Sequence, residues 1–261
     1  TDMVVEGVHF SPGTPSGAVA HKAIARCISD LAGMAARPLC TVAALKMGED
    51  TRESRHRELV AALPEAARNL CAPLVGGDIG SGGRALVLTV TAIGLAGPAG
   101  VIRRSGAQPG DMICVTGCLG GSIRGRHLQF TPRIEEALEL VKASDIHAMI
   151  DISDGLSTDL LHIADESGVA VEIDAGSVPA SPEAVELAKE SGHPPLWHAL
   201  NDGEDYELLF CTAPEEARQL ESRGLRGLPV TIIGRVTSGK EHYLITSDGE
   251  RTELHAEGWE H

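Results

Sequence analysis

Short apolar runs and apolar residues at helical spacing alternate along the chain, so strands and helices are expected to be interleaved. The apolar runs predict strands at residues 3–10, 41–47, 84–95, 112–116, 148–152, 169–174, 206–212, 230–236 and 243–246. Helical spacing predicts helices at residues 21–36, 53–70, 132–142 and 156–166. Pro64 lies inside the second of these helices, where its missing N–H predicts a break. The pattern indicates an α/β protein of the α+β type.

A polar, turn-forming stretch at residues 103–111 separates two groups of predicted elements. Domain boundaries fall preferentially in such segments, and 261 residues suffice for two ordinary domains. We therefore expect an N-terminal domain at residues 1–103 and a C-terminal domain at residues 104–261. Glycine-rich turns are expected at Gly76-Gly77-Asp78 and at residues 117–125.

The composition argues against several classes of partner. The chain carries 37 acidic and 22 basic residues, a formal net charge of -15 at pH 7, which opposes binding to a nucleic-acid backbone. Only 3% of the residues are aromatic, so platforms for stacking bases are scarce. The six cysteines lack C-x-x-C spacing and indicate reduced core residues.

No apolar run reaches the roughly 18 residues of a membrane span, and the first residues do not form a signal peptide. We expect a cytoplasmic protein that binds neither nucleic acid nor membrane. The first residue is Thr1 rather than Met, so we expect the natural start to lie upstream.

Acidic residues recur beside glycines or small residues at four places: Thr1-Asp2, Ser29-Asp30, Gly76-Gly77-Asp78 and Asp151-Ile152-Ser153-Asp154-Gly155. Carboxylates brought together raise one another's pKa, so their convergence requires a cation between them. Oxygen ligands of this kind suit Mg²⁺, which proteins hold through carboxylates and substrate phosphates. The last cluster also stands between a predicted strand and a predicted helix, where backbone N–H groups favour an anion. The clusters therefore predict a site for magnesium and a nucleotide.

Each of these features also has a plain structural explanation. Asp30 alone can be a solvated helix residue, and Asp154 can be the N-cap of the following helix. The turn at residues 117–122 lacks the lysine of a P-loop, so a simple tight turn is the better interpretation. Arg104 suits a phosphate because a guanidinium holds two oxygens at once, with a solvated linker residue as the alternative. Residues 201–207 contain four acids, in either a solvated or a functional loop.

Six segments together resemble the thiamine-monophosphate kinase family, in order and spacing across essentially the whole chain. They are Thr1-Asp2 with Glu6-Gly7-Val8-His9-Phe10, Ser29-Asp30-Leu31-Ala32, Gly76-Gly77-Asp78, Arg104-Ser105-Gly106-Ala107, residues 151–156 and residues 203–208. That family belongs to the aminoimidazole ribonucleotide synthetase-like ATP-binding superfamily, which shares the acid-rich nucleotide site. Residues 6–10 and 203–208 are therefore the more specific segments. The resemblance implies two domains, each a mixed sheet flanked by helices.

The resemblance also implies a role for each site residue. Magnesium ions that bridge the ATP phosphates would be held by Thr1, Asp2, Asp30, Asp78, Asp151 and Asp154. ATP would be contacted by Gly77, Arg104 and Ser153. Thiamine monophosphate would meet His9, Glu204 and Trp259. The family is homodimeric, so residues 1–103 would carry dimerisation as well as metal binding, and residues 104–261 would complete the nucleotide and substrate site.

The chain departs from the family pattern at three points. Relatives carry an upstream helix and a Gly-Asp-Asp strand with further metal ligands, and we expect this chain to lack both. Ile79 stands where threonine is usual, which removes a hydroxyl. The connection from Gly120 to Pro132 is shorter than in the family pattern, so we expect one helix of the second domain to be trimmed, and Asp202 stands where glycine is usual.

The activity that the resemblance implies is phosphorylation of thiamine monophosphate to thiamine diphosphate, with ATP as co-substrate and Mg²⁺ as cofactor. The acceptor is a phosphate oxygen that is already ionised at neutral pH. No general base is therefore expected, and the protein's task is to align the reactants in line and neutralise their charge. Two alternatives stay open: another ATP-using enzyme of the superfamily that activates an amide, and a non-catalytic nucleotide-binding dimer.

Overall fold

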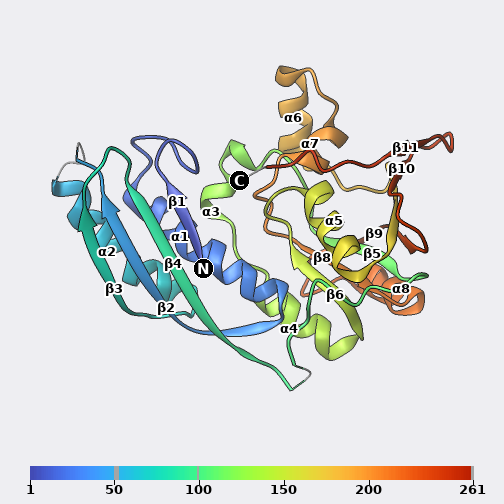
Figure 1. Ribbon diagram of the computed structural model, residues 1–261, viewed down its shortest axis with the longest axis horizontal. Coiled ribbons are helices and arrows are strands. Elements are labelled where there is room, and N and C mark those ends of the chain that lie inside the picture. The colour runs from blue at the N-terminus through green and yellow to red at the C-terminus, as the bar shows by residue number, and fades with distance from the viewer. Residues whose placement is uncertain (50–52, 99, 260–261) are drawn as a thin grey trace.

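The computed structural model describes residues 1–49, 53–98 and 100–259, and within these ranges the strands form two sheets (Figure 1). The first sheet has four strands in the order β1-β4-β2-β3. Its strands are β1 (Asp2–Val5), β2 (Ala36–Met47), β3 (Leu74–Ser81) and β4 (Val87–Ala96). Helices α1 (Ser16–Gly33) and α2 (Glu53–Asn69) pack against it through an aliphatic core that contains Ile24, Leu59 and Leu88.

The second sheet has seven strands in the order β11-β10-β7-β9-β5-β8-β6. They are β5 (Met112–Thr116), β6 (Ile146–Asp151), β7 (Ala170–Asp174), β8 (Leu208–Thr212), β9 (Val230–Thr237), β10 (Tyr243–Ile245) and β11 (Arg251–Glu253). The accompanying helices are η1 (Ser122–Arg124), α3 (Arg126–Gln129), α4 (Ile134–Ala143), α5 (Leu156–Ser167), α6 (Pro182–Ser191), α7 (Pro195–Asn201) and α8 (Pro214–Arg223). Strand β8 is buried on both faces: Leu209 joins the core under α5, and Phe210 joins the core under α4 and α8.

Helix α1 lies between the two sheets and packs against both of them (Figure 1). Its apolar stripe belongs to the first core, whereas Ala32 belongs to the core shared with α4 and α8. Gly33 makes this approach possible, because a Cβ there would lie 2.8 Å from the backbone nitrogen of Asp151 on β6. The last turn of α1 is therefore held against the end of β6.

Two sequence predictions in the first domain are wrong. Gly76-Gly77-Asp78 is not a turn, because these residues lie inside β3 and pair with β2 in a parallel ladder. Glycine is needed at position 77 because a Cβ there would lie 2.0 Å from the Ala43 carbonyl oxygen. The break at Pro64 is also absent, and α2 runs through that residue. Val60, whose carbonyl loses its helical partner, is on an exposed face of the helix where water can replace the bond.

The strand predicted at residues 3–10 is shorter than expected. It ends at Val5, and Gly7 then turns the chain with a φ of 86°. The amide of His9 donates to the Val5 carbonyl at 2.9 Å, so His9 sits in a turn that points toward the second domain's loops rather than on a strand. In the described residues, no helix is long and apolar enough to cross a bilayer.

Candidate active site

The loop after β6 carries the strongest predicted cluster and is held by a residue of the next helix. Asp151 ends β6, and Ser153 and Asp154 follow it before α5 begins. The Oδ2 atom of Asp159 accepts hydrogen bonds from the backbone amides of Ser153 and Asp154 at 2.9 and 3.0 Å. Because Asp159 is buried, these two hydrogen bonds anchor the loop to the protein interior.

Helix α1 delivers Asp30 to the same place. The hydroxyl of Ser29, which is fully buried, donates to Oδ2 of Asp151 at 2.5 Å. Asp30 follows directly and is exposed toward a cavity of 510 Å³ that also contains Asp151. Arg104 and Ser153 line this cavity as well, so residues from three distant parts of the chain converge on it. We refer to it below as the acidic cavity.

The carboxylates of the acidic cavity disturb one another's ionisation. Although Asp30 is open to the cavity, partial desolvation by the cavity walls raises its pKa to about 7, with Asp151 and Asp2 adding to the effect. Burial raises the pKa of Asp151 to about 6, and the nearby Asp154 and Asp2 act in the same direction. The pKa of Asp159 is also raised, by burial and by Asp151 and Asp154. Acids crowded in this way are suited to a bound cation, which would let all of them ionise together.

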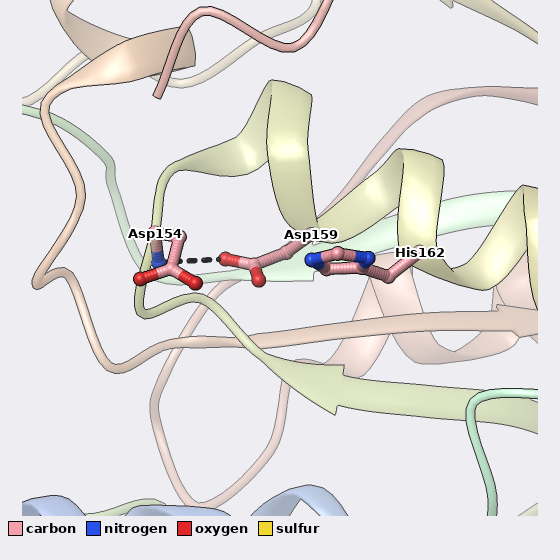
Figure 2. Close-up of side chains that lie close together, drawn as sticks. All are labelled: Asp154, Asp159 and His162. Atoms are coloured by element: carbon pink, nitrogen blue, oxygen red, sulfur yellow. Dashed lines mark hydrogen bonds between the residues drawn. The ribbon is translucent and has the colours of Figure 1, made fainter. Parts of the chain in front are cut away.

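Two residues at this site were missed by the sequence analysis. Figure 2 shows Asp159 and His162 beside Asp154, and one donor atom from each of the three lies within 4.8 Å of the others. All three line the acidic cavity. Asp159 and His162 are three residues apart on α5, so their helical spacing downstream of Asp154 was the signal in the sequence.

A second cavity of 210 Å³ is lined by all three residues that were expected to contact thiamine monophosphate: His9, Glu204 and Trp259. Ser153 and Asp154 line both cavities, so the two share a wall. We call this second space the acceptor cavity. The backbone nitrogen of Trp259 donates to the Asp154 carbonyl oxygen at 2.9 Å, which ties the last described residues to that wall.

Glu204 is held rigidly at the acceptor cavity. Both of its carboxylate oxygens contact the ammonium of Lys22, at 2.7 and 2.8 Å, and Lys22 is fully buried in α1. The Lys22 ammonium also donates to the His9 carbonyl at 2.6 Å. Burial lowers the pKa of Lys22, and Glu204 opposes that shift. The backbone of Glu204 has a φ of 53°, a conformation that costs free energy for a non-glycine residue.

Asp2 and Thr1 lie near the cavities without lining them. Oδ2 of Asp2 is 2.5 Å from Nε of Arg26, which lines the acceptor cavity. Thr1 is exposed at the edge of the first sheet, where its hydroxyl is 2.8 Å from the hydroxyl of Thr91. The sequence analysis did not single out Lys22 or Arg26, although two cations spaced i, i+4 on an otherwise apolar helix were a visible signal.

Gly77 and Asp78 are not brought to the other predicted site residues within one chain. They line a separate 250 Å³ cavity between β3 and α2, together with Ile79. Strand β3 is the edge of the first sheet that lies farthest from β1 (Figure 1). Asp202, in contrast, lines the acceptor cavity, where its carboxylate accepts from the Gly121 amide at 2.7 Å and contacts His198 Nδ1 at 2.8 Å.

Comparison with known proteins identifies the class to which this two-sheet fold belongs. The chain matches the models "AIR synthase related protein, N-terminal domain" at residues 1–96 and "AIR synthase related protein, C-terminal domain" at residues 76–247. These matches define the class as AIR synthase related proteins. HypE in complex with ATP, 22% identical with a TM-score of 0.78 over 98% of this chain and 84% of that one, shares the fold.

Within this class the chain belongs to the thiamine-monophosphate kinase family. It is 37% identical to the thiamine-monophosphate kinase of Rhodopirellula baltica, over 96% of this chain and 79% of that one. It is also 37% identical to that of Methanospirillum hungatei, over 100% and 87% of the two chains. The solved structure "AaThiL complexed with AMPPCP and TMP" has a TM-score of 0.85 at 30% identity and covers 100% of this chain and 85% of that one.

Proposed function

We propose that this protein transfers the terminal phosphoryl group of ATP to thiamine monophosphate and releases ADP and thiamine diphosphate. The observation that carries the proposal is the pair of cavities that share Ser153 and Asp154. A donor phosphate in the acidic cavity and an acceptor phosphate in the acceptor cavity would meet beside these two shared residues, where they could be aligned for in-line transfer. Relatives at 37% identity carry the name of this kinase, and the AaThiL structure combines AMPPCP with TMP.

Magnesium is proposed as the cofactor, held by Asp2, Asp30, Asp151 and Asp154, with Thr1 beside Asp2. The raised pKa values of Asp30 and Asp151 support this assignment. A cation bound between these carboxylates would stabilise their charged forms and replace the protons. Bound magnesium would neutralise the charge of the phosphates. The oxygen-rich donor set fits this metal.

The side chains of the two cavities would bind and orient the reactants. Arg104 and Ser153 line the acidic cavity and would contact the phosphates of ATP. In the acceptor cavity, Glu204 would face the cationic part of thiamine monophosphate and Trp259 would cover its rings. Burial lowers the pKa of His9, so this residue would be a neutral contact. The acceptor oxygen is an anion, so no residue is needed as a general base.

A homodimer is proposed from the uncovered face of the first sheet. Cross-strand pairing places Met3, Thr89, Ala44 and Asp78 in one row across the four strands. Met3 is 51% exposed, so the Met3 end of this row faces away from α1 and α2, while Asp78 at its other end also borders the cavity beside α2. A second copy seated on this face would bring its own first sheet next to Asp78. In this assignment residues 1–103 form the metal-binding and dimerisation domain, and residues 104–261 complete the site.

The test is to incubate the purified protein with ATP, Mg²⁺ and thiamine monophosphate and to follow ADP and thiamine diphosphate together. Equal formation of the two products is expected. Release of ADP without thiamine diphosphate would overturn the proposal in favour of another ATP-using reaction. Binding of ADP without any product would favour a nucleotide-binding dimer. Sedimentation of the wild type and of Thr89→Arg tests the dimer separately, since a charge on the proposed interface should produce monomers.

A further inference from the structure

Among the charged side chains that line the acceptor cavity, those that repel a phosphate outnumber those that attract it. Its wall includes the carboxylates of Asp154, Asp202 and Glu204. His9 offers no fixed positive charge, because burial and the neighbouring Arg26 lower its pKa. Among the described residues that line this cavity, Arg26 is the one permanent cation. A phosphate ester that enters the cavity therefore has one evident partner.

Arg26 is buried, and its donors are only partly used. The residue is 7% exposed. Its Nε is paired with Asp2 Oδ2 at 2.5 Å, whereas its Nη1 lies 3.7 Å from Glu204 Oε1 and makes no hydrogen bond within the described part of the chain. A buried donor without a hydrogen bond costs free energy, so Nη1 indicates a ligand with an acceptor oxygen.

Glu204 does not need Arg26 as its counter-charge. Lys22 already contacts both oxygens of Glu204, at 2.7 and 2.8 Å, and is closer to them than Arg26. The guanidinium carries five N–H groups in a planar fork that matches two oxygens of a phosphate. Asp2 is the close counter-charge of Arg26, on the Nε side of the guanidinium, so the Nη1 side is the part that can bind an anion at the shared wall.

On the basis of the proposed function, we infer that Arg26 binds the phosphate of the acceptor and makes the acceptor cavity specific for a phosphorylated substrate. In-line transfer requires that phosphate to lie near Ser153 and Asp154, and Arg26 lines the same cavity as both. The guanidinium would hold the phosphate next to the shared wall and neutralise part of its charge. It neither gives nor takes a proton. The unphosphorylated compound, thiamine, makes no use of this residue.

The inference is tested by calorimetric titration of thiamine monophosphate and of thiamine into the wild type, Arg26→Met and Arg26→Lys at a fixed magnesium concentration. Because Arg26→Met loses charge-assisted hydrogen bonds, its affinity for thiamine monophosphate is expected to fall by roughly tenfold to hundredfold. Its affinity for thiamine should change less than about threefold. Arg26→Lys keeps the charge but loses the fork, so its affinity for the phosphorylated ligand should be intermediate. Arg124→Met is the matched control, because Arg124 pairs with Glu190 at 2.6 Å and does not line the cavity.

If Arg26→Met binds both ligands more weakly by the same factor, so that the ratio of the two affinities is unchanged, the role of Arg26 is overturned. Steady-state kinetics supply a second measurement: KM for thiamine monophosphate should rise in both Arg26 variants while KM for ATP stays the same. An equal rise of both KM values also counts against the inference. If Arg26→Met does not fold, the same two comparisons are made with Arg26→Lys. Failure of the wild type to bind either thiamine compound would instead refute the proposed function.

Discussion

The buried ion pair between Lys22 and Glu204 connects helix α1 to the loop before β8, and its removal should destabilise the whole protein. The substitution Lys22→Met keeps the length and apolar stem of the side chain and deletes its charge. Glu204 then keeps a carboxylate next to a buried apolar group, and the His9 carbonyl loses its donor. The expected effect is a lower free energy of unfolding.

The magnitude follows from the burial of the two partners. Removing one member of a buried ion pair costs about 3–5 kcal/mol. Lys22 is 0% exposed and Glu204 is 26% exposed, so water can partly solvate the remaining carboxylate and the lower end, about 3 kcal/mol, applies. For a protein of this size, about 3 kcal/mol corresponds to a decrease in melting temperature of roughly 6–12 °C.

Thermal unfolding followed by circular dichroism measures this decrease. The double variant Lys22→Met, Glu204→Gln should be more stable than the sum of the single effects by about 1–3 kcal/mol, because no charge is left buried without a partner. Lys46→Met is a suitable control, since Lys46 is exposed and donates a hydrogen bond to the Ala85 carbonyl at 3.2 Å. A melting temperature of Lys22→Met within 1–2 °C of wild type, a change of under about 0.5 kcal/mol, would refute the reasoning.

Three further predictions concern the acidic cavity. Asp154→Asn should reduce turnover by at least about a hundredfold with an unchanged circular dichroism spectrum, and wild-type rates at saturating magnesium would contradict its role as a ligand. Protons occupy Asp30 and Asp151 in the metal-free protein below about pH 7 and pH 6. These raised pKa values mean that the folded state binds more protons than the unfolded state from about pH 4 to pH 7, so metal-free stability should fall as pH rises through that window. Magnesium competes with those protons, so its affinity by calorimetry should rise about tenfold from pH 6 to pH 8, and a flat profile would contradict the assignment. Gly33→Ala places a Cβ 2.8 Å from the Asp151 nitrogen and should lower stability by about 1–3 kcal/mol and weaken magnesium binding, whereas Gly17→Ala in the same helix, with nothing within 4 Å, should do neither.

The sequence was most informative where chemistry and local pattern agree. Residues 151–156 were expected to be a strand end followed by a helix start, and β6 and α5 are arranged in that way. Six of the seven strands of the second sheet were found from their apolar runs, and β11 was missed. Strand β5 has the predicted bounds of residues 112–116. Family membership and the mixed two-sheet fold are confirmed by the matches to known proteins.

The remaining errors arise from contacts between distant parts of the chain. Gly76 and Gly77 have the local signal of a turn, but pairing with β2 extends them into a strand, and only the partner strand reveals why glycine is required. Helices α6, α7 and α8 were missed, although each begins with a proline at a position that favours helix starts. Lys22 has no local feature that predicts its pairing with Glu204, since the two residues are 182 positions apart.

Because α1 carries Lys22, Arg26 and Asp30 on one rigid rod, the distances among their charged groups are set by helical geometry rather than by loop conformation. The same helix packs between the two sheets and contacts both of them. Hinge-like opening of one half of the molecule against the other would therefore have to break a packed core on at least one side of the helix. The rim of the acceptor cavity, in contrast, is formed in part by segments outside this helix, namely the turn around His9 and the stretch around Trp259.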